Sequence, residues 1–291
     1  MTPREYEILY KDLEVPILQD EKVVRWESVE LSEYVLIVSQ NPMTWDDQHP
    51  HNQAAYDALL GTLWGHFGQA NQKKATLTVH FQTADGGREH VEFDRWQDLW
   101  YHARKALLGK ASPEETVITL QLAARFGLLK SGDVQDYCDT YLGLDCNGFV
   151  GNYLVHGFGA GSPWDSESGE GYLANQQITS IVNKKVNVKN ISPGGMYLFA
   201  MVGANGNVVP GGGLPAGHIF VTNSNPQWPS DYIEGKSVSK VWTAMATEST
   251  GGGVGLITAP CQFVRDKDGI FTIKRQSHPH MAPLRFKAFR V

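Results

Sequence analysis

Cysteine is scarce in this chain, long apolar runs are absent, and basic residues do not outnumber acidic ones. An odd count of three, Cys138, Cys146 and Cys261, in 291 residues argues against a disulfide-stapled secreted scaffold. The longest apolar stretch, residues 196–202, is far shorter than the ~20 residues of a membrane helix, so we expect no transmembrane segment. A net charge of −6 gives no general attraction to polyanions, so nucleic acid is not an expected partner.

A conventional export signal is also lacking. The first residues, Met1-Thr-Pro-Arg-Glu-Tyr-Glu7, are charged and mixed, and no apolar core or small-residue cleavage site follows them. We therefore expect a protein that is cytoplasmic as synthesised and that reaches any target outside the cell by a non-classical route. A content of 42% hydrophobic and 19% charged residues suits one large domain or two small ones, and excludes disorder of the whole chain.

The best domain boundary lies between residues 111 and 112. Immediately after it, Ser112-Pro-Glu-Glu115 supplies an N-cap, a proline at the first helical position and a glutamate at the third. Before it, residues 1–111 are predicted to form a small N-terminal α/β unit of unknown role, in which the acidic stretch 5–33 is a solvated surface. The elements expected there are helices at 52–66 and 94–107 and strands at 76–83 and 89–93.

The order of elements after the boundary predicts an α+β fold. Helical patterns continue to about residue 142, and strand-like segments occupy most of the remainder. Helices followed by a run of strands favour helices packed on an antiparallel sheet over a doubly wound sheet. The expected strands lie at residues 185–188, 196–202, 218–223, 241–247, 255–257, 270–275 and 284–291.

Cys146 is the strongest candidate for a catalytic nucleophile. It follows Asp145, and apolar residues at helical spacing after it place it in the first turn of a buried helix. A helix N-terminus favours thiolate over thiol, so we expect a lowered pKa, and its free N–H groups can receive an oxyanion. The alternative is a small buried apolar residue. Cys138, between acidic neighbours, and Cys261, in an apolar segment, are predicted to be structural.

His218 is the best candidate for the base that a thiol nucleophile requires. It begins the apolar strand Gly217-His-Ile-Phe-Val221, and a polar ring at that position must find a hydrogen-bond partner. The alternative is a core histidine bonded to a backbone carbonyl.

These segments resemble a known family. Residues 145–150, Asp-Cys-Asn-Gly-Phe-Val, resemble the Asp-Cys-Ser-Gly-Phe-Val signature of the NlpC-type cell-wall peptidases, a branch of the papain-like cysteine peptidase and amidase superfamily. Residues 191–199 resemble the Pro-Gly-Asp-Leu strand of the family, and residues 217–221 resemble its histidine strand, in the same order. Residues 286–291 are similar to the closing strand. The resemblance covers roughly residues 112–291 and leaves the N-terminal unit unexplained.

The resemblance implies a papain-like domain in which Cys146 is the nucleophile and His218 the general base. The family places a third polar residue on the next strand, where Thr247 and Glu248 stand. Strand side chains alternate between faces, so only one of the two can point at the imidazole. We choose Glu248, because a carboxylate can hold the Nδ1–H and stabilise the imidazolium.

This sequence departs from the family pattern at several positions. Asn147 replaces the usual serine, and Gly195 replaces the usual aspartate of the Pro-Gly-Asp strand. The family tyrosine upstream of the cysteine has no clean counterpart, and Tyr137 and Tyr141 are the candidates. Together with Asp145 and Asn147, these tyrosines are the expected substrate-binding residues.

The implied activity is hydrolysis of an amide bond in peptidoglycan stem peptides through a thioester on Cys146, without a cofactor. The missing export signal motivates the hypothesis of an antibacterial effector or lysin, with a secretion-system or immunity-protein partner. Two alternatives remain: a papain-like thiol acyl hydrolase or transferase acting on a protein or lipid, and a catalytically inactive binding module. The histidine pairs 49/51 and 278/280 lack the further ligands of a zinc site, so no metal is expected.

Overall fold

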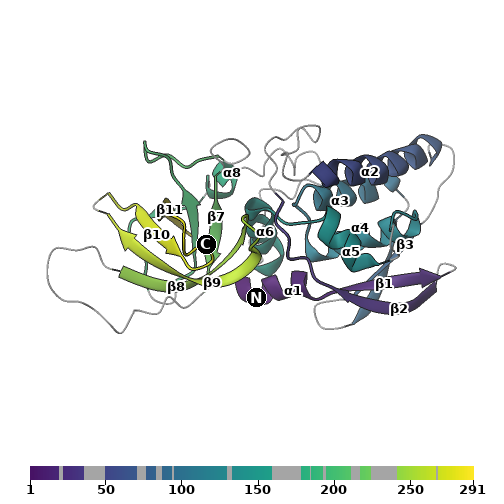
Figure 1. Cartoon of the computed structure of the whole chain (residues 1–291), viewed down its shortest axis with the longest axis horizontal. Helices are drawn as coiled ribbons and strands as arrows, with labels where there is room; N and C mark the ends of the chain where they lie inside the picture. Colours follow the sequence, from purple (N-terminus) through teal and green to yellow (C-terminus); the bar gives the residue numbers. More distant parts are fainter. Residues whose placement is uncertain are drawn as a thin grey trace.

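The structure is a computed structural model of the chain (Figure 1). The residues it describes are 1–19, 22–35, 50–70, 77–82, 87–93, 95–129, 133–158, 178–183, 185–192, 195–210, 217–223, 241–266 and 268–291.

The C-terminal half of the chain forms an antiparallel barrel. Within the described residues, seven strands share one sheet in the order β10-β9-β8-β7-β6-β11-β5. The pairing of β10 with β11 closes six of them into a barrel, and β5 extends the sheet beyond β11. The strands are β5 (Asn187–Val188), β6 (Tyr197–Met201), β7 (Ile219–Thr222), β8 (Val241–Thr250), β9 (Gly255–Arg265), β10 (Phe271–Arg275) and β11 (Leu284–Arg290).

Helices and two hairpins make up the rest of the described chain. Strands β1 (Leu13–Gln19) and β2 (Lys22–Val29) form one hairpin, and β3 (Leu77–Gln82) and β4 (Arg88–Phe93) form the other. The second hairpin was predicted from its alternation of apolar and polar residues. The helices are α1 (Pro3–Lys11), α2 (Pro50–Ala70), α3 (Trp96–Leu107), α4 (Pro113–Arg125), α5 (Val134–Tyr141), α6 (Cys146–Asn152) with the π-helical turn η1 (Tyr153–Gly157), and α8 (Ile178–Val182).

The predicted start of α4 is confirmed by its cap. Ser112 accepts a hydrogen bond from the Glu115 N–H, and the Glu115 carboxylate accepts one from the Ser112 N–H. Two N–H groups that the helix itself leaves free are thereby satisfied, which fixes the point where the chain turns into α4.

The two faces of the barrel strands bury different partners. Phe199 on β6 and Phe220 on β7 face the barrel interior, where their rings stack with centroids 5.3 Å apart. Ile219 and Val221 alternate with Phe220 and join the other apolar cluster, outside the barrel. Helix α6 packs against this outer face, between the barrel and helices α2 to α5 (Figure 1).

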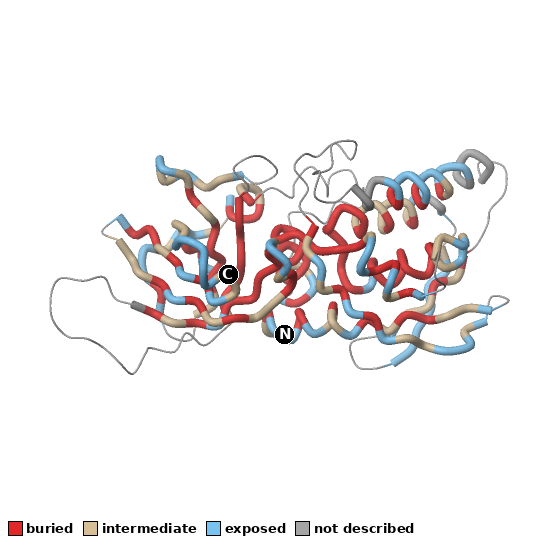
Figure 2. Tube along the Cα trace, in the orientation of Figure 1, coloured by how far each residue is buried: buried red, intermediate tan, exposed pale blue. Residues whose placement is uncertain are grey.

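A single apolar cluster crosses the predicted boundary at residues 111/112. Tyr6 of α1 lies with its ring centroid 6.0 Å from that of Phe149 in α6 and 5.8 Å from that of Tyr153. The whole of α6 is buried, and Figure 2 shows buried residues continuing from α6 into both halves. The division into 1–111 and 112–291 stays a prediction, since a shared core is compatible with two units in firm contact.

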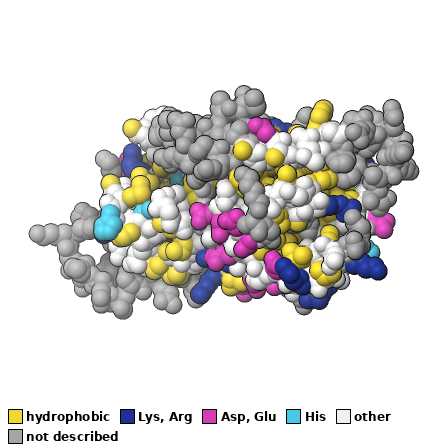
Figure 3. Space-filling view, turned by 45° about the vertical axis from the view of Figure 1, so that its right-hand side comes forward, with side chains coloured by type: hydrophobic (Ala, Val, Ile, Leu, Met, Phe, Trp, Pro, Cys, Tyr) yellow, Lys and Arg dark blue, Asp and Glu magenta, His cyan; other side chains and the backbone are white. Residues whose placement is uncertain are grey.

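The expectation that residues 5–33 are a solvated surface holds for exposed acidic residues such as Glu5 and Glu30 but is wrong for the segment as a whole. Tyr6, Tyr10 and Val15 are each at most 1% exposed, because residues four apart on α1 and alternate residues on β1 turn inward, and Glu7 is also buried. Acidic side chains are nevertheless prominent outside: they gather near the centre of the face shown in Figure 3. In the described part of the chain, no helix combines the length and apolarity needed to cross a membrane.

Candidate active site

Strand β8 holds both sides of the candidate site. Glu248 Oε2 lies 2.6 Å from His218 Nε2, at the start of β7. The next residue, Ser249, faces the opposite side of the strand, where its hydroxyl donates to the carbonyl of Leu144. Leu144 belongs to the loop that leads into α6 and Cys146. Two adjacent residues of one strand therefore place the histidine and the cysteine loop relative to each other.

The structure distinguishes the two residues proposed as the third member. Glu248 contacts the imidazole, whereas Thr247 turns away and bonds the Thr258 hydroxyl at 2.7 Å. The choice of Glu248, made because a carboxylate can hold the imidazole, therefore agrees with the geometry, and its catalytic role stays a prediction. The nitrogen differs from the expected one, because Glu248 bonds Nε2 and not Nδ1.

Arg275, at the end of β10, is a member of the site that sequence reasoning missed. Its Nη1 lies 2.6 Å from Glu248 Oε2 and 3.0 Å from His218 Nε2. Ser277 donates to the other oxygen, Oε1, so both oxygens of the carboxylate are engaged. His218, Glu248 and Arg275 continue the interior-facing side of β7, β8 and β10, and together they close one end of the barrel.

The charge of Glu248 settles which nitrogen of His218 carries the proton. Burial alone raises the pKa of Glu248, but the hydrogen bond from His218 and the charges of His218 and Arg275 outweigh it and lower that pKa to about 2. An ionised carboxylate only accepts hydrogen bonds, so Nε2 must donate. In the neutral ring, Nδ1 then keeps a free lone pair, which is the position from which a base accepts a proton.

Cys146 begins α6, and the preceding residue caps the helix. Asp145 accepts the Gly148 N–H with one oxygen and the Lys110 ammonium with the other. Gly148 is required here because a Cβ at this position would lie 2.0 Å from the carbonyl oxygen of Gly109. The close approach brings Lys110, which lies between α3 and α4, into the cysteine site.

The expectation of a lowered thiol pKa is wrong for this structure. Burial, and next the charge of Asp145, raise the pKa of Cys146 to about 12. The Lys110 charge and the backbone N–H groups of Ile219 and Asn147 act in the opposite direction but are outweighed. Cys146 is 4% exposed, and the loss of hydration penalises a thiolate more than a short helix end favours it.

The thiol reaches the strand of His218 through the backbone. The N–H of Ile219, the residue directly after His218, is one of the groups that stabilise the Cys146 sulfur. Within the described residues, no hydrogen bond joins the thiol to the imidazole; the side-chain partner of the sulfur is Asn147 Oδ1 at 3.5 Å. The structure thus places the start of α6 against the strand that His218 begins, but the thiol lies on the outer side of the sheet whereas the imidazole continues its interior-facing side, and the two reactive groups are not bonded.

Tyr34, from the N-terminal half, also lies near the site. It lies in the segment 30–35, which is held by the hydrogen bonds Leu144 N–H to Glu33 C=O (2.9 Å) and Leu256 N–H to Ser32 C=O (3.0 Å). Burial first, then the charges of Cys146 and Asp145, raise the pKa of Tyr34 above its ordinary value. No local motif signals this tyrosine, because more than 100 residues of sequence separate it from the cysteine.

The other expected tyrosines lie elsewhere. Tyr137 and Tyr141 both belong to α5, with ring centroids 4.9 Å apart. Within the described chain, neither makes a hydrogen bond to Cys146, His218 or Glu248. As substrate-binding residues they remain predictions without support from the geometry, whereas Asp145 and Asn147 do adjoin the thiol.

The histidine pairs do not form part of a metal site in the described residues. His278 Nε2 bonds the Thr250 hydroxyl at 2.8 Å, and no group of three or more potential metal ligands occurs there. His49 and the side chain of His51 lie outside the described residues. Gly195 packs against Tyr197, so a side chain at the position of the family aspartate would meet that ring.

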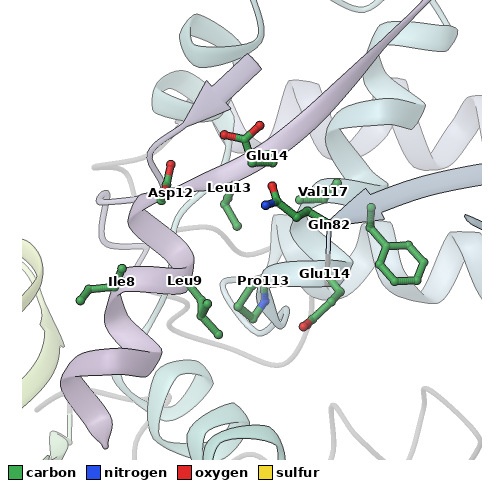
Figure 4. Close-up of a pocket in the computed structure, with 10 residues that line it drawn as sticks. Ile8, Leu9, Asp12, Leu13, Glu14, Gln82, Pro113, Glu114 and Val117 are labelled. Carbon is green, nitrogen blue, oxygen red and sulfur yellow. The ribbon is translucent and has the colours of Figure 1, made fainter. Parts of the chain in front are cut away.

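A separate cavity of about 260 Å³ lies between α1, β1 and the start of α4. Figure 4 shows an apolar floor that includes Leu9 and Leu13, with the carboxyl groups of Asp12, Glu14 and Glu114 around it. Neither Cys146 nor His218 lines this cavity, so it is distinct from the candidate active site.

Comparison of the chain with protein-family models, curated proteins and solved structures gives no match. The functional argument therefore rests on this site: a buried thiol at a helix start, an imidazole with an oriented Nε2, and an ionised carboxylate shared with an arginine.

Proposed function

We propose that this protein is a cysteine hydrolase that cleaves an amide bond in peptidoglycan stem peptides through a thioester on Cys146. The observation that carries the proposal is the His218–Glu248 pair, with the Cys146 sulfur at the N–H of the residue next to that histidine. A helix that carries the cysteine against a barrel that carries the histidine and carboxylate is also what a papain-like domain requires. Cell-wall peptide as substrate comes from the resemblance of residues 145–150 to the NlpC-type signature.

The residues divide the reaction into two balanced steps. As the Cys146 sulfur attacks the amide carbon, its proton passes to His218 Nδ1 and the carbonyl oxygen becomes an oxyanion. When the intermediate collapses, the C–N bond breaks and the imidazolium returns its proton to the departing amine, which leaves a thioester. Water then attacks the thioester with His218 as base, and releases the acid and the thiol. The N–H groups that face the sulfur are candidates to receive the oxyanion.

A raised thiol pKa fits general-base attack better than a preformed ion pair. With Cys146 protonated and His218 held neutral by burial, which lowers its pKa, the proton moves only as the sulfur attacks. Because Cys146 is 4% exposed, a scissile bond reaches the sulfur only after part of the surrounding surface has moved. The proposed proton transfer also requires the imidazole, which faces the barrel interior in this structure, to turn toward the thiol.

The site of action follows from the proposed substrate. An enzyme that cuts wall peptides must reach the cell wall, so we propose an exported antibacterial effector or a lysin, with a secretion-system or immunity-protein partner. Directing the protein to the periplasm of a susceptible bacterium tests this. Lysis by the wild type but not by Cys146→Ala supports the proposal, and growth unaffected by both contradicts it.

The test of the activity itself is mass spectrometry of purified peptidoglycan after digestion. The wild type is expected to release fragments cut at one stem-peptide amide, and Cys146→Ala to release none. Cys138→Ala is the matched control, because it removes a buried thiol that bonds the Glu30 carbonyl and lies outside the site. The same fragments from Cys146→Ala would show that this sulfur is not the nucleophile.

The rival functions give other outcomes in the same experiment. Intact muropeptides, with hydrolysis of a protein amide or a lipid ester that also depends on Cys146, would identify a thiol acyl hydrolase of different specificity. Binding of muropeptides without any cleavage would identify an inactive binding module.

A further inference from the structure

Arg275 is a buried cation that the proposed reaction does not yet use. It is 7% exposed, and its Nη1 contacts Glu248 Oε2 at 2.6 Å, His218 Nε2 at 3.0 Å and the Thr250 hydroxyl at 3.4 Å. The arginine reaches these groups from β10, which is separated from β7 by β8 and β9 on one side of the barrel. Closure of the barrel therefore brings the guanidinium over the end of β7.

We infer that Arg275 is a positioning residue for His218: its guanidinium shares one carboxylate oxygen with the imidazole, fixing Glu248 and balancing its charge. The inference rests on the proposed function, because it matters only where His218 acts as a base. Nothing in the resemblance to the NlpC-type family points to this arginine.

The carboxylate needs more than the imidazole to remain in place. Glu248 is 1% exposed, and a buried carboxylate is stable only when its oxygens are paired. A neutral imidazole supplies a single N–H, which leaves the rest of the hydrogen-bonding capacity unused. Arg275 satisfies Oε2 and Ser277 satisfies Oε1, so the carboxylate keeps one orientation whether or not His218 is charged.

Arg275 also prevents Glu248 from holding His218 as a permanent imidazolium. The charged and titratable groups facing His218 are Glu248 from β8, Arg275 from β10 and His278 from the turn after β10. Glu248 favours the charged ring, whereas burial and Arg275 disfavour it. A base must be neutral before it accepts a proton, so the arginine keeps His218 available for the thiol proton.

The sign of the expected effect follows from the charge. A positive group beside the ring destabilises the imidazolium, so its removal must raise the pKa of His218. Arg275→Met removes the charge and the hydrogen bond to Glu248, whereas Arg275→Lys keeps a positive charge but loses the planar group that reaches Glu248 and His218 together. Arg275→Gln keeps a hydrogen-bond donor but carries no charge. It replaces Arg275→Met in the experiment if the methionine variant does not fold.

The experiment is an NMR titration of ¹³C-labelled histidine rings, in which the His218 signal is assigned with His218→Gln. We expect the His218 midpoint to move to higher pH in Arg275→Met or Arg275→Gln and to stay close to that of the wild type in Arg275→Lys. Arg285→Met is the matched control, since the ion pair that Arg285 on β11 makes within the described residues is a long, exposed one of 3.8 Å to Asp266. It should leave the midpoint unchanged.

Kinetics of muropeptide cleavage supply the second readout. The acid limb of kcat/KM should move to higher pH with Arg275→Met or Arg275→Gln, while Arg275→Lys keeps the limb and lowers kcat by about 10-fold or more through lost orientation. A His218 midpoint that is the same in Arg275→Met and Arg285→Met would overturn the inference. The titration needs no substrate, so it decides the role of Arg275 even if the wall is not the target.

Discussion

Cys146→Ala and His218→Ala are each expected to lower muropeptide cleavage by at least about 10³-fold, and the double variant is expected to be no slower than the single ones. The reason is that nucleophile and base act as one unit, so the loss of either removes the same step. Initial rates measured by chromatography of the released fragments check this result.

Thr247→Val is the control for those two variants. Thr247 stands next to Glu248 on β8 but bonds Thr258, on the side of the strand away from His218. The rate of muropeptide cleavage by Thr247→Val should stay within a few-fold of the wild-type rate. If the effects of Cys146→Ala and His218→Ala multiply in the double variant, the two residues act independently and the proposed pair is wrong.

Lys110→Met is expected to have the largest effect on folding, with a loss of about 3–5 kcal/mol in the free energy of unfolding. The Lys110 ammonium contacts Asp145, and the two side chains are 10% and 9% exposed. Without the lysine, the buried carboxylate in front of Cys146 has lost its ionic partner. Burial already raises the pKa of Asp145 despite the charge of Lys110, so the imbalance would increase. Urea denaturation of each variant measures the loss.

A second substitution separates the charge effect from lost packing. Lys110→Met combined with Asp145→Asn should recover much of the stability, because asparagine still caps α6 and carries no charge. Arg25→Met is the comparison variant, because it breaks a surface ion pair in which the side chains of Arg25 and Glu27 are 64% and 30% exposed. Its loss in the free energy of unfolding should stay below about 1 kcal/mol. Equal losses for Lys110→Met and Arg25→Met would show that the buried ion pair is not what stabilises this loop.

Local patterns were sufficient for much of the fold. The cap at Ser112, the alternation in β3 and β4 and the seven strand-like segments after residue 180 all depend on neighbours a few residues apart. The first hairpin escaped prediction because its inward residues, such as Val15, are interrupted by charged ones and by Pro16. Closure of the barrel through β10 and β11 was not predicted either, because the pairing of two strands leaves no local pattern in the sequence.

The candidate site was predictable only where a motif marked it. The thiol and the imidazole stand in motifs. Alternation along β8 reduced the third member to one of two residues, and the chemistry of a carboxylate selected Glu248 over Thr247. Arg275, Lys110 and Tyr34 come from other parts of the chain and meet the site through tertiary structure. The direction of the thiol pKa was mispredicted for the same reason, because burial and the Asp145 charge depend on everything packed around α6.

Acid quenching during muropeptide turnover, followed by intact-mass analysis and peptide mapping, tests the central claim most directly. The account predicts an added acyl group on the peptide that contains Cys146, released by hydroxylamine as a thioester is, and absent from Cys146→Ala. An acyl group on any other residue, or turnover by Cys146→Ala at the wild-type rate, would contradict it.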